Sequence, residues 1–261
     1  EAFVAAGDLF HSKQQISDAW QEYRDALKIN PASPEALLGC ASCQFHNGEF
    51  AQAEQSCLSA LETNPSLVAA HELLAAIDLV DERYEQAREK LGTALKINTN
   101  SLDSRALLAS LHFLENDQEK FEQECRRVLA VDPKCSGLYE TVGQVCTLKR
   151  RMEDAKAMFE KALEIDPDSS DALAELGLLY LRDAQYEKGR EMLTKSFRIN
   201  NFNVRVYNSL ELCDKMATFQ THKTDHFVFK VDAENDPVLA HYATIELEKI
   251  REEVCSRFNS Y

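Results

Sequence analysis

The tripeptide Ile29-Asn30-Pro31 recurs along this chain at a spacing of 34 residues, and this recurrence decides the fold class. Its later copies are Thr63-Asn64-Pro65, Ile97-Asn98-Thr99, Val131-Asp132-Pro133, Ile165-Asp166-Pro167 and Ile199-Asn200-Asn201. Proline cannot continue a helix because it lacks the backbone N–H, so we expect a helix to end at each copy. A fixed period of this length predicts a solenoid of stacked helix pairs.

Other positions keep the same register. Small residues recur at Gly7, Ala41, Ala75, Ala109, Gly143 and Gly177, and again at Ala19, Ala53, Ala87, Ala155 and Gly189. Phe121 is the one exception in the second series. We expect the small residues to lie where paired helices approach closely.

Each frame contains apolar residues at helical spacing, which predicts two amphipathic helices per frame. Ser33-Pro34-Glu35 combines an N-cap residue, a first-turn proline and an acidic residue, as expected at a helix start. A single pair cannot bury its apolar faces, whereas stacked pairs share a continuous core. Such an array provides surface rather than an active site, so we expect it to bind another protein.

The pattern resembles the tetratricopeptide repeat, for example in Phe50-Ala51-Gln52-Ala53, Cys57, Ala60-Leu61 and Pro65. The resemblance covers about residues 1–217 and implies an all-α, right-handed superhelix. It also implies a concave groove lined by fixed positions of each first helix. The partner-binding residues that follow from it are Leu38, Phe45, Glu72, Leu79, Phe113, Glu140 and Leu178. The apolar members would suit a peptide with apolar anchors, unless the superhelix packs them into its own core.

The composition is acidic, with 29 Lys and Arg against 44 Asp and Glu and a net charge of -15. This balance argues against nucleic acid or an anionic membrane as partner and favours basic or neutral protein surfaces. The sequence contains no apolar run long enough to insert into a membrane. Glu1 already stands at the second position of a frame, so we expect the chain to be an excised fragment.

Cysteine and histidine motifs favour packing over chemistry. Cys40-Ala41-Ser42-Cys43 lies within a predicted helix and has no second pair at zinc-finger spacing, so we interpret its thiols as buried and free. Free thiols favour a reducing cytoplasm. His71-Glu72-Leu73-Leu74-Ala75 lacks the second histidine of a zinc protease helix, and His222, His226 and His241 are scattered. We therefore predict no cofactor, no metal site and no catalytic residue.

The C-terminal residues depart from the repeat. We predict six repeats in residues 1–203, a capping helix in 204–217, a linker in 218–225 and a strand-helix tail in 226–261. The strand, His226 to Asp232, is aromatic and β-branched, and the helix begins at Asp236-Pro237. An isolated strand must pair with something, and addition to a second copy would give a homodimer.

The tail resembles the entry strand and first helix of bacterial zincin metallopeptidases that follow repeat arrays, over about residues 219–258. The residues that carry the resemblance are His226-Phe227-Val228-Phe229-Lys230-Val231-Asp232, Pro237-Val238-Leu239-Ala240-His241-Tyr242-Ala243 and Leu247-Glu248-Lys249-Ile250. The family's zinc helix is not in this sequence. Two hypotheses follow: a non-catalytic protein-interaction scaffold, or the substrate-recruiting arm of a larger zinc metallohydrolase.

Overall fold

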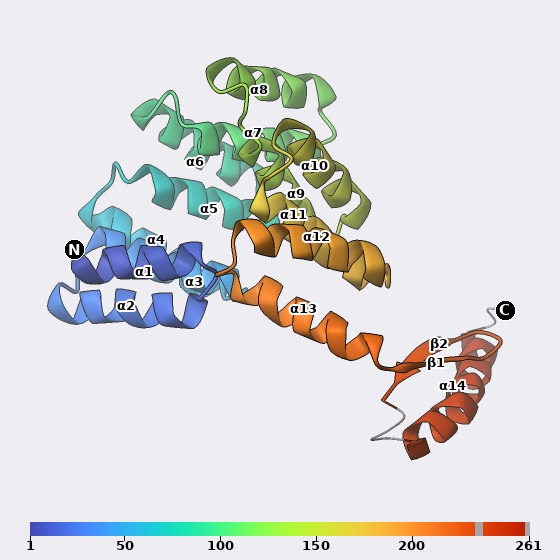
Figure 1. Ribbon diagram of the computed structural model, residues 1–261. Helices are drawn as coiled ribbons and strands as arrows, with labels where there is room; N and C mark the ends of the chain where they lie inside the picture. The colour runs from blue at the N-terminus through green and yellow to red at the C-terminus, as the bar shows by residue number, and fades with distance from the viewer. Residues whose placement is uncertain (233–236, 259–261) are drawn as a thin grey trace. The chain divides into compact units, whose positions relative to one another are not determined.

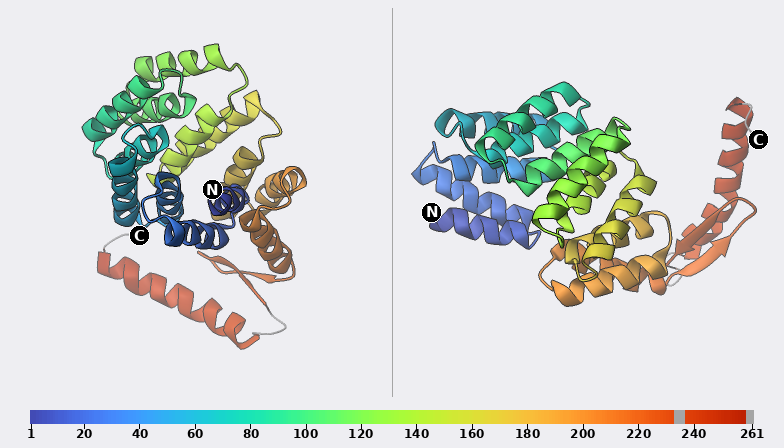
Figure 2. Two further views of the ribbon diagram at one scale, coloured as in Figure 1. Left: turned by 90° about the vertical axis from the view of Figure 1, so that its left-hand side faces the viewer. Right: turned by 90° about the horizontal axis from the view of Figure 1, so that it is seen from above.

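The computed structural model describes residues 1–232 and 237–258, which form two compact units, Glu1–Tyr207 and Asn208–Tyr261. The first unit contains six helix pairs that wind around a common axis (Figures 1 and 2). The first helices of the pairs are α1 (Ala2–Ser12), α3 (Pro34–His46), α5 (Val68–Val80), α7 (Leu102–Leu114), α9 (Gly137–Leu148) and α11 (Ser170–Arg182). The second helices are α2 (Ile16–Ile29), α4 (Phe50–Thr63), α6 (Tyr84–Ile97), α8 (Gln118–Val131), α10 (Met152–Ile165) and α12 (Tyr186–Ile199). The predicted all-α, right-handed superhelical solenoid is confirmed.

The same side-chain hydrogen bond stabilises the turn at every copy of the tripeptide. In all six copies the central Asn or Asp accepts, through Oδ1, a hydrogen bond from the backbone N–H two residues later, at 2.9 to 3.3 Å. The side chain thereby imitates a backbone turn. This explains why the chain also turns where Thr99 and Asn201 replace proline.

The turn between the two helices of each pair contains one residue in the left-handed conformation. The residues with positive φ are Gln14, Gly48, Glu82, Asn116, Arg150 and Ala184, again 34 residues apart. Gly48 adopts this conformation without steric cost, whereas Ala184, at φ 58°, does not.

The predicted small positions lie between closely packed helices. Gly143 of α9 faces Phe159 of α10, and a Cβ atom on this glycine would lie 2.8 Å from the ring. In the fourth pair the large and the small residue exchange positions. Helix α8 carries the large Phe121 at the position that is small in other repeats, and the small Cys125 at the position where α10 carries Phe159. The same repeat also packs differently: α7 contacts α9 more extensively than any other two successive first helices contact each other.

The helix α13 (Val204–Ala217), predicted as a capping helix in residues 204–217, begins at the end of the first unit. Asn203 caps it, since its Oδ1 accepts a hydrogen bond from the backbone N–H of Val206 at 3.1 Å. Val206 is buried, and the Tyr207 ring lies 6.0 Å from the ring of Phe197.

The second unit contains an antiparallel hairpin of β1 (Gln220–Lys223) and β2 (Val228–Val231), followed by α14 (Pro237–Phe258). Gln220 pairs with Val231, and Lys223 pairs with Val228. Glu248 of α14 accepts hydrogen bonds from the Thr224 hydroxyl, at 2.5 Å, and from the His226 backbone N–H, at 2.9 Å. This carboxylate therefore fixes the helix to the hairpin turn.

Two expectations for the tail need correction. The predicted strand is present as β2, but the segment predicted as a linker contains β1, which pairs with it. The polar residues Gln220 to Lys223 gave no hydrophobic alternation from which to predict a strand. Because the pairing is made within the chain, β2 does not require a second copy. Asp236, the predicted start of the final helix, and residues 259–261 lie outside the described residues.

Candidate protein-interaction surface

The middle of the predicted groove is filled by the chain itself. Leu79 of α5 has no exposed surface and packs in one cluster with Leu107, Leu111 and Leu114 of α7 and Val145 of α9. The prediction that Leu79 contacts a partner is therefore wrong. The prediction assumed an open concave face, whereas α9 reaches α5 across it.

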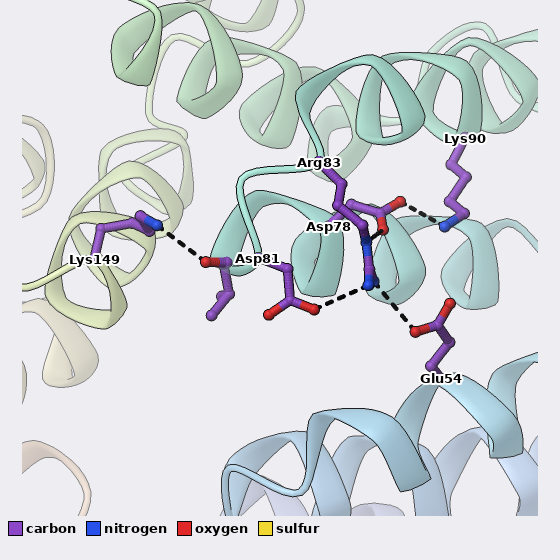
Figure 3. A network of polar contacts seen from close by, with 7 residues as sticks. Glu54, Asp78, Asp81, Arg83, Lys90 and Lys149 are labelled. Atoms are coloured by element: carbon purple, nitrogen blue, oxygen red, sulfur yellow. Dashed lines mark hydrogen bonds and ion pairs between the residues drawn. The ribbon is translucent and has the colours of Figure 1, made fainter.

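An ion-pair network holds this closed region together (Figure 3). Lys149, the C-cap residue of α9, donates to the backbone carbonyl of Val80 at 3.0 Å and pairs with Glu82 at 2.5 Å. Beside it, the buried Asp78 pairs with Arg83 at 2.6 Å and with Lys90 at 2.5 Å. Arg83 also reaches Glu54 of α4 at 3.2 Å, so these ion pairs link α4, α5 and α6.

The two predicted aromatic residues pack against the second helices of their own repeats. The Phe45 ring lies 5.3 Å from that of Phe50, and the Phe113 ring lies 5.3 Å from that of Phe121. The Arg151 guanidinium lies 5.0 Å from the centre of the Phe113 ring. Both residues are half-buried, so each ring makes a structural contact while part of the side chain remains exposed.

The two predicted glutamates accept hydrogen bonds from the start of the next first helix. Glu72 accepts from the hydroxyls of Ser101 and Ser104, at 2.6 and 2.5 Å, and Glu140 accepts from Ser169 at 2.8 Å. Ser101 and Ser169 are also the N-caps of α7 and α11. These carboxylates therefore join successive repeats.

Leu178 of α11 lines a small cavity of about 40 Å³ where the superhelix closes on its first turn. Gln14 from the α1–α2 turn and Arg205 from α13 line the same cavity. Beside Gln14, the Lys13 ammonium lies 3.7 Å from the centre of the Phe202 ring. The first and sixth repeats therefore meet, and Leu178 faces this junction rather than an open groove.

A larger hollow of about 410 Å³ remains between α1 and α3. The predicted residue Leu38 lines it, together with the acidic residues Asp8 and Glu35. Its floor is Tyr23 of α2, whose hydroxyl donates to Asp8 at 2.7 Å. Burial and this hydrogen bond raise the pKa of Tyr23, so the phenol stays protonated and remains a donor.

Sequence reasoning did not identify Tyr23 as part of this hollow. The sequence feature that could have indicated Tyr23 is the pair of glycines Gly7 and Gly39, because a Cβ atom on either would lie within 2.6 Å of the Tyr23 ring. The ring therefore occupies the space that two missing side chains leave between α1 and α3. His11 also lines the hollow, and burial lowers its pKa although Asp8 acts in the opposite direction.

Comparison with known proteins agrees with this architecture. Family profiles described as tetratricopeptide repeat match residues 11–77, 136–169 and 158–191. This chain is a tetratricopeptide repeat protein. No curated protein gave a significant sequence match.

Several solved structures resemble this repeat protein in fold. A chain of the APC/C hetero-tetramer Cut9–Hcn1 is 15% identical, with a TM-score of 0.53, and the match covers 81% of the present chain but only 42% of that chain. A tetratricopeptide repeat protein from Parabacteroides merdae is 18% identical, with a TM-score of 0.53 and coverage of 81% and 83%. A thermophilic repeat protein of Thermus thermophilus is 21% identical, with a TM-score of 0.55 and coverage of 69% and 98%.

The cysteine and histidine motifs of the repeat protein lie in structural positions. Cys40 and Cys43 are free and buried, and burial raises the pKa values of their thiols to about 11 and 12. Such thiols are poor nucleophiles and poor metal ligands. His71 hydrogen-bonds the carbonyl of Pro65 at 3.0 Å.

The tail histidines also have contacts within the chain, since His226 pairs with Glu248 at 2.8 Å and His222 stacks on Phe229. Among residues 1–232 and 237–258, no group of three metal-ligating side chains comes together. No helix in these ranges has the length and apolar character needed to cross a membrane.

Proposed function

We propose that this tetratricopeptide repeat protein is a non-catalytic protein-interaction scaffold and that it binds a peptide segment in the hollow between α1 and α3. The observation that carries the proposal is the hollow of about 410 Å³ on the concave side, at a place that the chain does not fill itself. The middle of the same face is packed by α5, α7 and α9. The repeat family supports protein binding in general.

The lining of the hollow indicates the chemistry of the ligand. Leu38 offers an apolar contact, while Asp8 and Glu35 place negative charge on either side of it. A short segment with one apolar anchor and a neighbouring Lys or Arg would satisfy both features. The net charge of -15 would also attract such a segment from a distance.

The test is selection of peptides from a random display library on the immobilised chain, followed by affinity measurement for each selected peptide. We expect peptides that combine Lys or Arg with an apolar residue, and we expect Leu38→Asp and Glu35→Lys each to weaken their binding at least tenfold. Leu58→Asp is the matched control, because Leu58 is an exposed leucine on α4. Equal binding to all variants, with unchanged helical content, would contradict the proposal.

The predicted homodimer through the tail remains part of the proposal, now through α14 rather than through an unpaired strand. Several large apolar side chains of α14 are more than half exposed, among them Leu239, Tyr242 and Ile250. We expect a dimer that dissociates on Tyr242→Lys and Ile250→Lys substitution, as measured by sedimentation. A mass unchanged by the substitutions would reject this contact. The metallohydrolase arm stays a sequence-based prediction, since no observation on the described residues favours it.

A further inference from the structure

The exposed face of α12 has a charge opposite to that of the chain as a whole. It carries four cations, Lys188, Arg190, Lys195 and Arg198, and only two carboxylates, Glu187 and Glu191, although acidic residues exceed basic residues by 15 in the whole sequence. These six residues and Thr194 line a shallow hollow of about 430 Å³. Lys188 and Lys195 are seven residues apart, as are Glu191 and Arg198, so the residues follow one side of the helix.

Two of these cations differ from most others in the solenoid. Arg83, Arg88, Lys149 and Lys156 all lie within 4 Å of a carboxylate from another part of the chain. On α12, Lys195 pairs with Glu191 at 2.8 Å. In the described part of the chain, Lys188 and Arg198 have no ion-pair partner, and the Lys188 ammonium lies 5.5 Å from the centre of the Tyr180 ring.

Leaving Lys188 and Arg198 without carboxylate partners costs little free energy in water, but their positive charge indicates a negatively charged ligand. Exposed lysines and arginines in an acidic protein normally find carboxylates, because both are abundant on the surface. Positive potential that is left on one helix face attracts negative charge over about one Debye length, roughly 10 Å at 0.1 M salt. The shallow hollow offers a contact surface along that face.

We propose that the exposed face of α12 binds an acidic protein segment, as a second interaction surface distinct from the hollow between α1 and α3. The ligand is a short acidic segment rather than nucleic acid or an anionic membrane, because a long polyanion or an extended charged surface would also face the acidic remainder of the chain. The scaffold would then bind one basic and one acidic partner through different helices.

The test is titration of the full chain with a fluorescein-labelled deca-glutamate peptide at low ionic strength, read by fluorescence anisotropy. The key variant is Lys188→Glu with Arg198→Glu, and the matched control is Lys96→Glu with Lys134→Glu, which changes the net charge equally at exposed lysines outside α12. Because two attractive contacts become repulsive, we expect about a tenfold or greater loss of affinity for the α12 variant and less than about a twofold loss for the control.

A neutral variant, Lys188→Gln with Arg198→Gln, separates charge from helix stability and should give an intermediate loss with unchanged circular dichroism. Equal weakening by the α12 variant and the control, or no measurable binding to wild type, would overturn the proposal. Tighter binding of single-stranded oligothymidine or of phosphatidylserine vesicles than of the peptide would also overturn it. Leu38→Asp should leave peptide binding unchanged, which distinguishes this surface from the hollow between α1 and α3.

Discussion

Asp78 and Arg83 form an ion pair in which the fully buried carboxylate of Asp78 lies 2.6 Å from the guanidinium Nε of Arg83, the N-cap residue of α6. Lys90 approaches the other carboxylate oxygen at 2.5 Å. The hydrogen bond to Asp78 raises the pKa of Arg83. A buried charge is tolerated only when it is paired, so Arg83 and Lys90 together compensate the buried carboxylate of Asp78.

Replacing Asp78 with Asn should therefore destabilise the chain. The substitution leaves Arg83 and Lys90 without their central partner, and breaking a buried pair costs about 3 kcal/mol or more. Urea unfolding followed by circular dichroism measures the loss. Asp81→Asn is the control, because the exposed Asp81 also pairs with Arg83, at 3.1 Å, and an exposed pair contributes about 1 kcal/mol or less. Equal losses in the two variants would show that burial of Asp78 is not the cause.

Leu79→Ala should act on stability rather than on partner binding. The side chain is fully buried between α5, α7 and α9, and truncating such a leucine costs about 2 to 5 kcal/mol. Leu148→Ala, at an exposed position of the same concave face, should cost less than about 1 kcal/mol. Thermal unfolding of both variants decides the point. A small loss for Leu79→Ala would mean that the groove is open in solution.

The period of 34 residues was sufficient to predict the solenoid, the helix ends and the small residues at helix contacts. These features depend on interactions within one or two repeats, such as the hydrogen bond from the N–H of Ala32 to the side chain of Asn30. The same repeated pattern indicated Ser33 as the N-cap of α3, and its hydroxyl accepts from the N–H of Ala36.

The burial of Leu79 could not be predicted in this way. It depends on the angles between successive repeats, which accumulate from α5 to α9, so no single frame contains the information. The close packing of α7 on α9 occurs at the repeat where Phe121 breaks the small-residue series. The deviation was visible in the sequence, but its effect on the path of the superhelix was not.

Thr99→Pro should stabilise the chain by about 0.4 to 1 kcal/mol, since proline restricts the unfolded chain without changing the folded turn. Proline occupies the equivalent position in four of the other repeats, and Asn98 already has the extended conformation that precedes proline, with φ -128° and ψ 96°. Asn100→Pro is the control. It should destabilise the chain, because the N–H of Asn100 donates to Asn98. Urea midpoints measure both effects, and a lower midpoint for Thr99→Pro would contradict the prediction.

Ala184→Gly should also stabilise the chain, by about 0.5 to 1 kcal/mol, because alanine pays a steric cost at φ 58° that glycine avoids. Gly48 occupies the equivalent turn at φ 79°, so Gly48→Ala should give a loss of similar size. The melting temperatures of the two variants should therefore move in opposite directions. Movement in the same direction would show that the left-handed conformation does not control the stability of these turns.

Stability should fall as the pH is lowered from 7 to 5, partly through His112. Burial lowers the pKa of this side chain, Arg88 and Lys120 lower it further, and Glu115 acts in the opposite direction. Its Nδ1 makes no hydrogen bond among the described residues, and the nearest carboxylate oxygen, Oε2 of Glu115, lies 3.5 Å away. Because the unfolded state binds the proton at a higher pH than the folded state, the stabilising contribution is present above about pH 6.5 and is lost as the pH falls through the folded pKa. The loss is at most about 1.4 kcal/mol per pH unit for one histidine.

Urea unfolding at pH 7 and pH 5 should show a smaller difference in stability for His112→Gln than for wild type. Part of the difference should remain in the variant, because burial also lowers the pKa values of His11 and His46. An identical pH dependence in the variant would show that His112 is equally protonated in the folded and unfolded states.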